Sequence, residues 1–142
     1  MKIDAIVFDG MEMPKITQIE NDLDGFYGAI KCSTFEGYSN TELGHLYGLD
    51  IYLDGNGKIR EDKPMLTGLF VRKETNEIVD TLVGNLLICC HDQEGESVSV
   101  YPASDKAVAK HVRPRVVTNI PKVWEDGFGS FQTAPYLLVL YC

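Results

Sequence analysis

The sequence predicts an α+β fold: one compact domain built mainly from antiparallel β-hairpins, with two short helices. Leu49–Ile59 and Gly84–Tyr101 each begin as an apolar or alternating run, break at an acidic turn that contains glycine, and resume as a second extended run. Helical spacing of apolar residues occurs at 23–31 and 104–112. The chain has 142 residues, 44% hydrophobic and 24% charged, which is typical of a globular protein with its own core.

The N-terminal third predicts two strands followed by a helix. Ile3–Asp9 is largely apolar and Lys15–Glu20 alternates apolar and polar residues, so both segments favour strands. Asn21 is the expected N-cap of a helix that ends near Lys31. Residues 37–48 contain three glycines among polar residues, and we expect them to form a loop or one broken turn.

The rest of the chain predicts more hairpins, a second helix and a final strand. Asn56 precedes a glycine and favours the tight turn of the first hairpin. Leu69–Val71 and Ile78–Val79 favour strands separated by a polar turn. Ser104–Val112 has an N-cap and helix formers, and Tyr136–Tyr141 has the length and composition of a buried strand.

The charge is negative and unevenly distributed. The net charge is −8, and residues 1–62 carry 12 Asp or Glu against 5 Lys or Arg. Such a surface disfavours direct binding to DNA or to an anionic membrane, and it suits a basic partner. We expect the partner-binding surface to be drawn from the acidic residues of this half: Asp22, Asp24, Glu36, Glu42, Asp50 and Asp54.

Targeting signals and disulfides are not expected. The N-terminus lacks a basic region followed by an apolar stretch, and no apolar run approaches the roughly 18 residues that span a bilayer. We therefore predict a cytoplasmic protein, in a bacterial host, with no membrane partner. The four cysteines are expected to be reduced thiols.

Several motifs resemble enzyme or metal sites but are incomplete. Asp9 follows a strand as in haloacid-dehalogenase-type phosphotransferases, yet the second aspartate is replaced by Met11. The acidic turn at 50–61 resembles a calcium loop, but Tyr52 or Lys58 falls where an oxygen ligand is needed, so we interpret it as turn chemistry. The run Cys89–Asp92 offers two metal-binding side chains on each strand face and no second cluster. We expect neither a metal nor a cofactor.

Two further groups of residues stay open as sites. A basic segment with Trp124 nearby favours contact with phosphate or an acidic ligand, or alternatively is a solvated helix face; its candidate residues are Lys106, Lys110, Arg113 and Arg115. An enzymatic site assembled from distant residues would use Cys90, His91, Asp92 and His111.

Several short segments, taken in order, resemble a family of phage and mobile-element proteins known as domain of unknown function 3846. A strand with Pro14 comes first and a helix after Tyr101 comes last, and between them lie Ile19–Leu23, Gly55–Ile59, Val83–Ile88 and Glu94–Val98. The resemblance covers about residues 1–112, which we interpret as an α+β core domain. Residues 113–142 are then a C-terminal extension packed on that core. The resemblance implies a phage or mobile-element origin and supplies no catalytic residue.

The leading hypothesis is a non-enzymatic acidic binding protein that inhibits or sequesters a host factor, such as a nucleic-acid-binding defence protein. Sequestering a small nucleotide through the basic segment is a second route to the same effect. The alternatives are a small enzyme with the Cys/His/Asp site above, and a structural component that forms homo-oligomers through exposed sheet edges.

Overall fold

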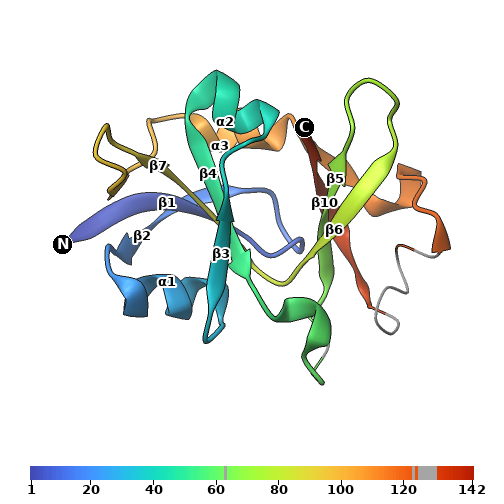
Figure 1. Ribbon diagram of the computed structural model, residues 1–142, viewed down its shortest axis with the longest axis horizontal. Helices are drawn as coiled ribbons and strands as arrows, with labels where there is room; N and C mark the ends of the chain where they lie inside the picture. The colour runs from blue at the N-terminus through green and yellow to red at the C-terminus, as the bar shows by residue number, and fades with distance from the viewer. Residues whose placement is uncertain (63, 123, 125–130) are drawn as a thin grey trace.

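The computed structural model describes residues 1–62, 64–122, 124 and 131–142. In this part of the chain two β-sheets face each other and three α-helices pack around them (Figure 1). All strand pairs except one are antiparallel. The predicted α+β class is therefore confirmed.

Sheet A has the strand order β2-β1-β7-β4-β3, and the short strand β8 pairs with β7. Its strands are β1 (Lys2–Phe8), β2 (Lys15–Glu20), β3 (Phe35–Tyr38), β4 (Leu49–Asp54), β7 (Leu86–His91) and β8 (Ser97–Val98). The predicted N-terminal strand pair is confirmed, with Ile3 opposite Ile19.

Sheet B has the strand order β6-β5-β10-β9. Its strands are β5 (Leu66–Val71), β6 (Ile78–Val83), β9 (Val112–Pro114) and β10 (Thr133–Tyr141). The predicted C-terminal strand is present as β10, which lies between β5, its parallel partner, and β9. Part of the C-terminal segment thus lies inside sheet B.

The three helices are α1 (Leu23–Ile30), α2 (Glu42–Tyr47) and α3 (Ser104–Ala109). Helix α1 begins one residue later than predicted, since Asp22 and not Asn21 is its N-cap and accepts the Gly25 N–H. In α3, Ser104 is the first helical residue; the N-cap is Ala103, which has a left-handed φ of 68° and no side-chain capping bond.

Helix α2 was not predicted, because its three neighbouring glycines favour a loop. Thr41 supplies the missing start signal, since its hydroxyl accepts the Gly44 N–H. Gly48 ends the helix at φ 67°, a left-handed conformation that glycine adopts without cost. Of the glycines that favoured a loop, Gly44 therefore lies within the helix and Gly48 ends it, while Gly37 lies in β3.

The first predicted hairpin is wrong. Asn56 has φ −112° and does not adopt the positive φ of a tight turn, and the 3-10 helix η1 (Gly57–Ile59) stands where the second strand was expected. Strand β4 pairs instead with β3 and β7. The interpretation of its acidic end as turn chemistry agrees with the contacts there, since Asp54 Oδ1 accepts the Asn56 N–H at 2.9 Å.

The other predicted hairpins are confirmed. Strands β5 and β6 pair across a polar turn in which Asn76 has φ 59°. Strands β7 and β8 pair across a turn closed by Asp92, whose Oδ1 accepts the backbone N–H groups of Glu94 and Glu96 at 2.9 Å each. Both turns are local in sequence, so residue type alone was enough to predict them.

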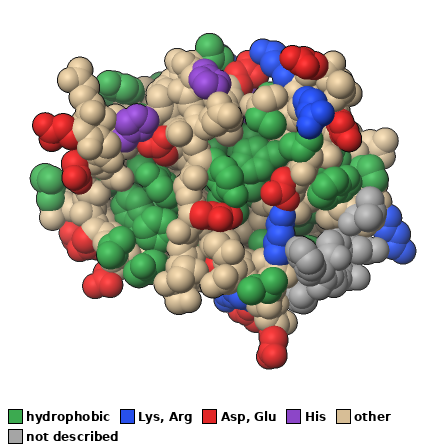
Figure 2. All heavy atoms as spheres, viewed as in Figure 1, with side chains coloured by type: hydrophobic (Ala, Val, Ile, Leu, Met, Phe, Trp, Pro, Cys, Tyr) green, Lys and Arg blue, Asp and Glu red, His purple; other side chains and the backbone are tan. Residues whose placement is uncertain are grey.

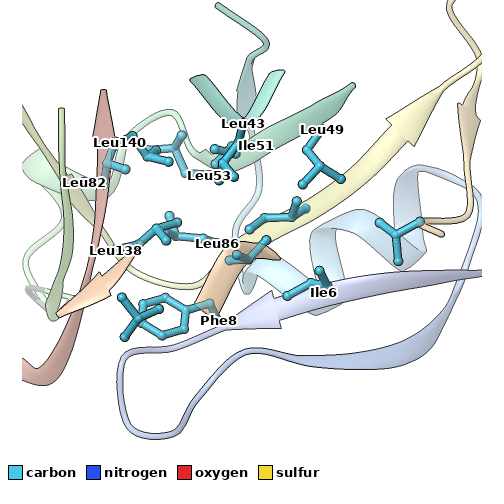
Figure 3. Close-up of a cluster of buried hydrophobic side chains, with 14 of the residues drawn as sticks. Ile6, Phe8, Leu43, Leu49, Ile51, Leu53, Leu82, Leu86, Leu138 and Leu140 are labelled. Atoms are coloured by element: carbon cyan, nitrogen blue, oxygen red, sulfur yellow. The ribbon is translucent and has the colours of Figure 1, made fainter. Parts of the chain in front are cut away.

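The main core lies between the two sheets. Side chains from β1, β4, β6, β7, α2 and β10 point toward one another there (Figure 3). Phe8, Leu43, Ile51, Leu86 and Leu138 are each no more than 1% exposed.

Two smaller clusters cover the outer faces of the sheets. Helix α1 packs on the outer face of sheet A, which we call the α1 face, through Phe26 and Ile30 against Ala5, Leu87 and Cys89. On the outer face of sheet B, Ile120 and Phe131 pack against residues of β5 and β10. No helix within the described residues has the length and apolarity needed to cross a bilayer.

Candidate functional site

The six predicted acidic residues do not form a single site. On α1, Asp22 is occupied as the N-cap, while the neighbouring Asp24 is exposed in the first turn. The Glu36 carboxylate accepts the Tyr38 hydroxyl at 3.0 Å, and Glu42 lies 3.5 Å from the Lys73 ammonium.

Two of these acids, Asp50 and Asp54, are buried and already have partners. Asp54 is 6% exposed and its carboxylate pairs with the Arg60 guanidinium at 2.9 Å. Arg60 also pairs with Asp62, and both carboxylates raise the pKa of Arg60. Asp50 is likewise 6% exposed and bonds to His91. These two acids belong to internal polar networks and do not form an open acidic surface.

The predicted basic residues lie on α3, β9 and the turn that follows. Arg113 donates to the backbone carbonyls of Lys110 and Val112, and Arg115 donates to the carbonyl of Thr118. Both guanidinium groups therefore interact with nearby backbone carbonyls. Lys106 and Lys110 lie at opposite ends of the last turn of α3.

The Cys/His/Asp set is not brought together. Cys90 points into the core between the sheets, whereas the neighbouring His91 points to the α1 face. Asp92 closes the β7–β8 turn, and the His111 ring lies 6.2 Å from that of Tyr141, with Nδ1 buried and without a hydrogen bond among the described residues. Nor do three or more His, Cys, Asp or Glu side chains converge as a metal site within the described ranges.

An aromatic cluster on the α1 face forms the first hollow of a candidate site. Phe26, Phe35 and Tyr52 contact one another with ring centroids 5.4–5.7 Å apart, in tilted and edge-to-face arrangements. A hollow of about 280 Å³ opens on these rings, and we call it the aromatic hollow. Asp22 and Glu96 stand at its edge, beside the exposed Leu23.

Figure 2 shows the surroundings of this hollow. A hydrophobic patch lies on the left of this view, between the positions of α1 and the β7–β8 turn in Figure 1, and acidic side chains border it. The Lys and Arg side chains visible on this face lie along its top, in its right half and at its lower edge. The aromatic hollow therefore lies in a negative part of the surface.

A second hollow of about 280 Å³ adjoins the first at Tyr52, which lines both. We call it the His91 hollow. It is lined by Gly37, Tyr38, Ser39, Asp50, Tyr52, His91 and Gly95.

In the His91 hollow, Asp50 Oδ2 lies 2.7 Å from His91 Nδ1. A carboxylate can only accept, so Nδ1 carries a proton, and in the neutral form of the ring Nε2 is then an acceptor. The His91 side chain is 46% exposed, and the described residues offer Nε2 no hydrogen bond.

The ring of Tyr52 lies directly over Gly37 on the neighbouring strand. A Cβ at Gly37 would come within 2.6 Å of the Tyr52 ring, so only glycine leaves room for this position of the ring. Burial raises the pKa of Tyr52, with further contributions from Cys89 and Asp50. The Tyr52 ring therefore separates the two hollows, and its phenol stays protonated at neutral pH.

Sequence reasoning missed this arrangement. Asp50 was assigned to an acidic partner surface and His91 to a Cys/His/Asp set, whereas Tyr52 was noted only because it breaks a calcium-loop pattern. The three meet because β4 pairs with both β3 and β7. That pairing is long-range, and no local signal reports it.

The comparisons with known proteins agree with the family resemblance. No curated protein and no solved structure matched the chain in these comparisons. The family model described as Domain of unknown function (DUF3846) matches residues 1–113, which include both hollows and all of sheet A. The protein therefore belongs to the DUF3846 family.

Proposed function

We propose that this protein is a small acidic binding protein that receives a positively charged segment of another protein on the α1 face of sheet A. The observation that carries the proposal is the aromatic hollow with its acidic edge, formed by Phe26, Phe35 and Tyr52 beside Asp22 and Glu96. Aromatic faces attract cations, and nearby carboxylates add long-range attraction for the same ligand.

The size of the hollows supports a peptide segment over a cofactor. Each has about 280 Å³, just below the roughly 300–1,000 Å³ that is typical of small-molecule pockets. Two adjoining hollows of this size suit neighbouring side chains of one segment. The exposed Leu23 extends the apolar surface at the edge of the aromatic hollow.

The partner in this proposal is a host protein, in keeping with the phage or mobile-element setting that the family resemblance implies. A defence factor that binds nucleic acid has a basic surface of the required kind, and occupying that surface would inhibit it without any catalysis by this chain. Capture of a nucleotide by the basic segment is less well supported, because Arg113 and Arg115 already donate to backbone carbonyls.

The test is binding of short basic peptides, with variants that remove charge at the hollow but keep the fold. Asp22→Ser retains an N-cap for α1, so Asp22→Ser/Glu96→Gln removes two negative charges from the edge of the aromatic hollow. Glu74→Gln/Glu77→Gln removes the same charge from the β5–β6 turn and is the matched control.

Arginine- and lysine-rich peptides that also contain an aromatic residue should bind the wild type at low salt, as measured by calorimetry. The hollow variant should bind about tenfold more weakly and the control within about twofold. The same three proteins then serve as baits in a bacterial lysate, where the partner is the protein that the wild type and control retain and the hollow variant loses. Absence of peptide binding, or equal weakening in both variants, would overturn the proposal.

A further inference from the structure

We infer that the His91 hollow is a specificity pocket for one arginine side chain of the bound segment. This inference rests on the proposed function and names the residue that the partner would insert. The hollow adjoins the aromatic hollow at Tyr52, so a segment lying across the α1 face can reach both.

The polar groups of the His91 hollow are arranged to accept hydrogen bonds from a cation. Asp50 supplies a buried negative charge, and by accepting from Nδ1 it leaves Nε2 of His91 as an acceptor. The Tyr38 hydroxyl donates to Glu36 at 3.0 Å, and its ring packs between the sheets, so this hydroxyl offers the hollow no donor. Among the described residues, those lining the hollow include no Lys or Arg. An anionic ligand would therefore meet acceptors and negative charge, whereas a cation finds partners.

The walls favour arginine over lysine. Tyr52 lines the hollow and its ring is held over Gly37, whereas the Tyr38 ring packs on Phe70 between the sheets, with the ring centroids 5.1 Å apart. A guanidinium is planar and weakly hydrated, so it stacks on a ring such as Tyr52 while its edge donates to an acceptor such as Nε2. An ammonium is compact and strongly hydrated, and it gains less from a single acceptor and one ring wall.

The probes are N-acetyl-arginine amide and, as the matched control, N-acetyl-lysine amide, titrated separately into the full chain. Binding is followed by NMR through the ring resonances of His91 and Tyr52. His91→Lys places an ammonium beside Asp50, so the buried carboxylate keeps a partner while the hollow is filled by a positive charge. His91→Ala opens the hollow without adding charge, and urea unfolding checks that each variant is folded.

The arginine probe should shift both rings saturably and bind at least about threefold more tightly than the lysine probe. His91→Lys should abolish the shifts of Tyr52, and His91→Ala should weaken them. The inference is overturned if the arginine probe leaves both rings unaffected, if the two probes bind equally, or if His91→Lys still binds the arginine probe.

These results separate the inference from the proposed function. If basic peptides bind and respond to Asp22→Ser/Glu96→Gln, but substituting each arginine by lysine changes nothing, the binding function stands and the arginine pocket is wrong. If the arginine probe binds at His91 while no basic peptide binds, the pocket recognises guanidinium and the proposed protein partner is wrong.

Discussion

The His91 imidazole and the Asp50 carboxylate are held 2.7 Å apart by strands β7 and β4. Asp50 is buried and His91 is half-exposed, so this hydrogen bond links a buried carboxylate to a side chain that solvent can reach. Neither residue has this partner unless the two strands align with Leu49 opposite Cys90. The contact therefore forms only when β4 and β7 are correctly paired, and it is part of the His91 hollow.

The Asp50–His91 pair should show energetic coupling. His91→Ala leaves a buried acceptor without its partner, and we expect it to lower the free energy of unfolding by about 1–2 kcal/mol, since solvent partly reaches the site. Asp50→Ala should cost a similar amount, and Asp50→Ala/His91→Ala should cost about 1 kcal/mol less than the sum of the two. Urea unfolding of all four proteins measures this cycle, and strict additivity would show that the contact contributes nothing.

Two glycine substitutions should change stability in opposite directions. Gly37→Ala brings a Cβ within 2.6 Å of the Tyr52 ring, so we expect it to destabilise the protein by about 1–3 kcal/mol and to change the Tyr52 ring resonances. In α1, Gly28 has open space around its Cβ position, and Gly28→Ala should stabilise the protein by about 0.5–1 kcal/mol. Urea unfolding compares the two, and equal effects would contradict the placement of Tyr52 over Gly37.

The four thiols should react with alkylating agents in a fixed order at pH 8. Cys142 is exposed and should react first. Burial raises the pKa of Cys32 and of Cys90, and it raises that of Cys89 to about 12, so Cys32 should react slowly and the buried Cys90 and Cys89 only after unfolding. Mass spectrometry of iodoacetamide-treated protein, with and without urea, gives the order. Early labelling of Cys89 in the folded protein would show that sheet A opens readily on the α1 face.

The Tyr38 phenol should ionise late in an alkaline titration. Burial, together with the hydrogen bond to Glu36, raises its pKa to about 12. Because the folded-state pKa is raised, the associated stability is complete below the ordinary value near 10 and is lost as the pH rises through about 12. Tyr38→Phe should therefore be less sensitive than the wild type to pH in this interval, as measured by urea unfolding. Absorbance at 295 nm should lose its latest-titrating phenol in the same variant.

The segment after residue 112 should be required for folding. Leu138 is fully buried between the sheets, and Leu138→Ala should cost about 2–5 kcal/mol. A fragment ending at residue 113 lacks all of β10, which leaves β5 without its parallel partner. We expect it to show no cooperative unfolding transition by circular dichroism. A cooperative transition in this fragment would make 1–112 an independent domain.

The parts of the fold that sequence predicted are those determined by neighbouring residues. Strands β1 and β2, the turn at Asn76 and the turn closed by Asp92 depend on alternation and turn-forming side chains that lie side by side in the chain. The hairpin predicted at Asn56 failed because β3 and β7, both distant in sequence, compete for β4 and take both of its edges.

The candidate site was predictable only in part. Negative charge in the first half of the chain and the exposed position of Asp24 follow from composition and helix signals. The aromatic hollow does not, because Phe26, Phe35 and Tyr52 come from a helix and two strands whose packing is tertiary. For Asp50 and Asp54 the prediction was wrong. Acidic residues near strand ends are usually exposed to solvent, but the pairing of β4 with β3 and β7 buries both of them.

The central position of β10 in sheet B bears on how the protein is made. On a ribosome the chain emerges from its N-terminus, so sheet A, with β2, β1 and the β7–β8 hairpin, is available long before residues 133–141 appear. Until then Leu86, Phe8 and Leu43 have no Leu138 or Leu140 to cover them. An exposed apolar surface of this kind attracts chaperones and self-association, and closing it requires contacts between distant parts of the chain, which form slowly. Recombinant yield should therefore depend strongly on temperature and on chaperone supply during synthesis.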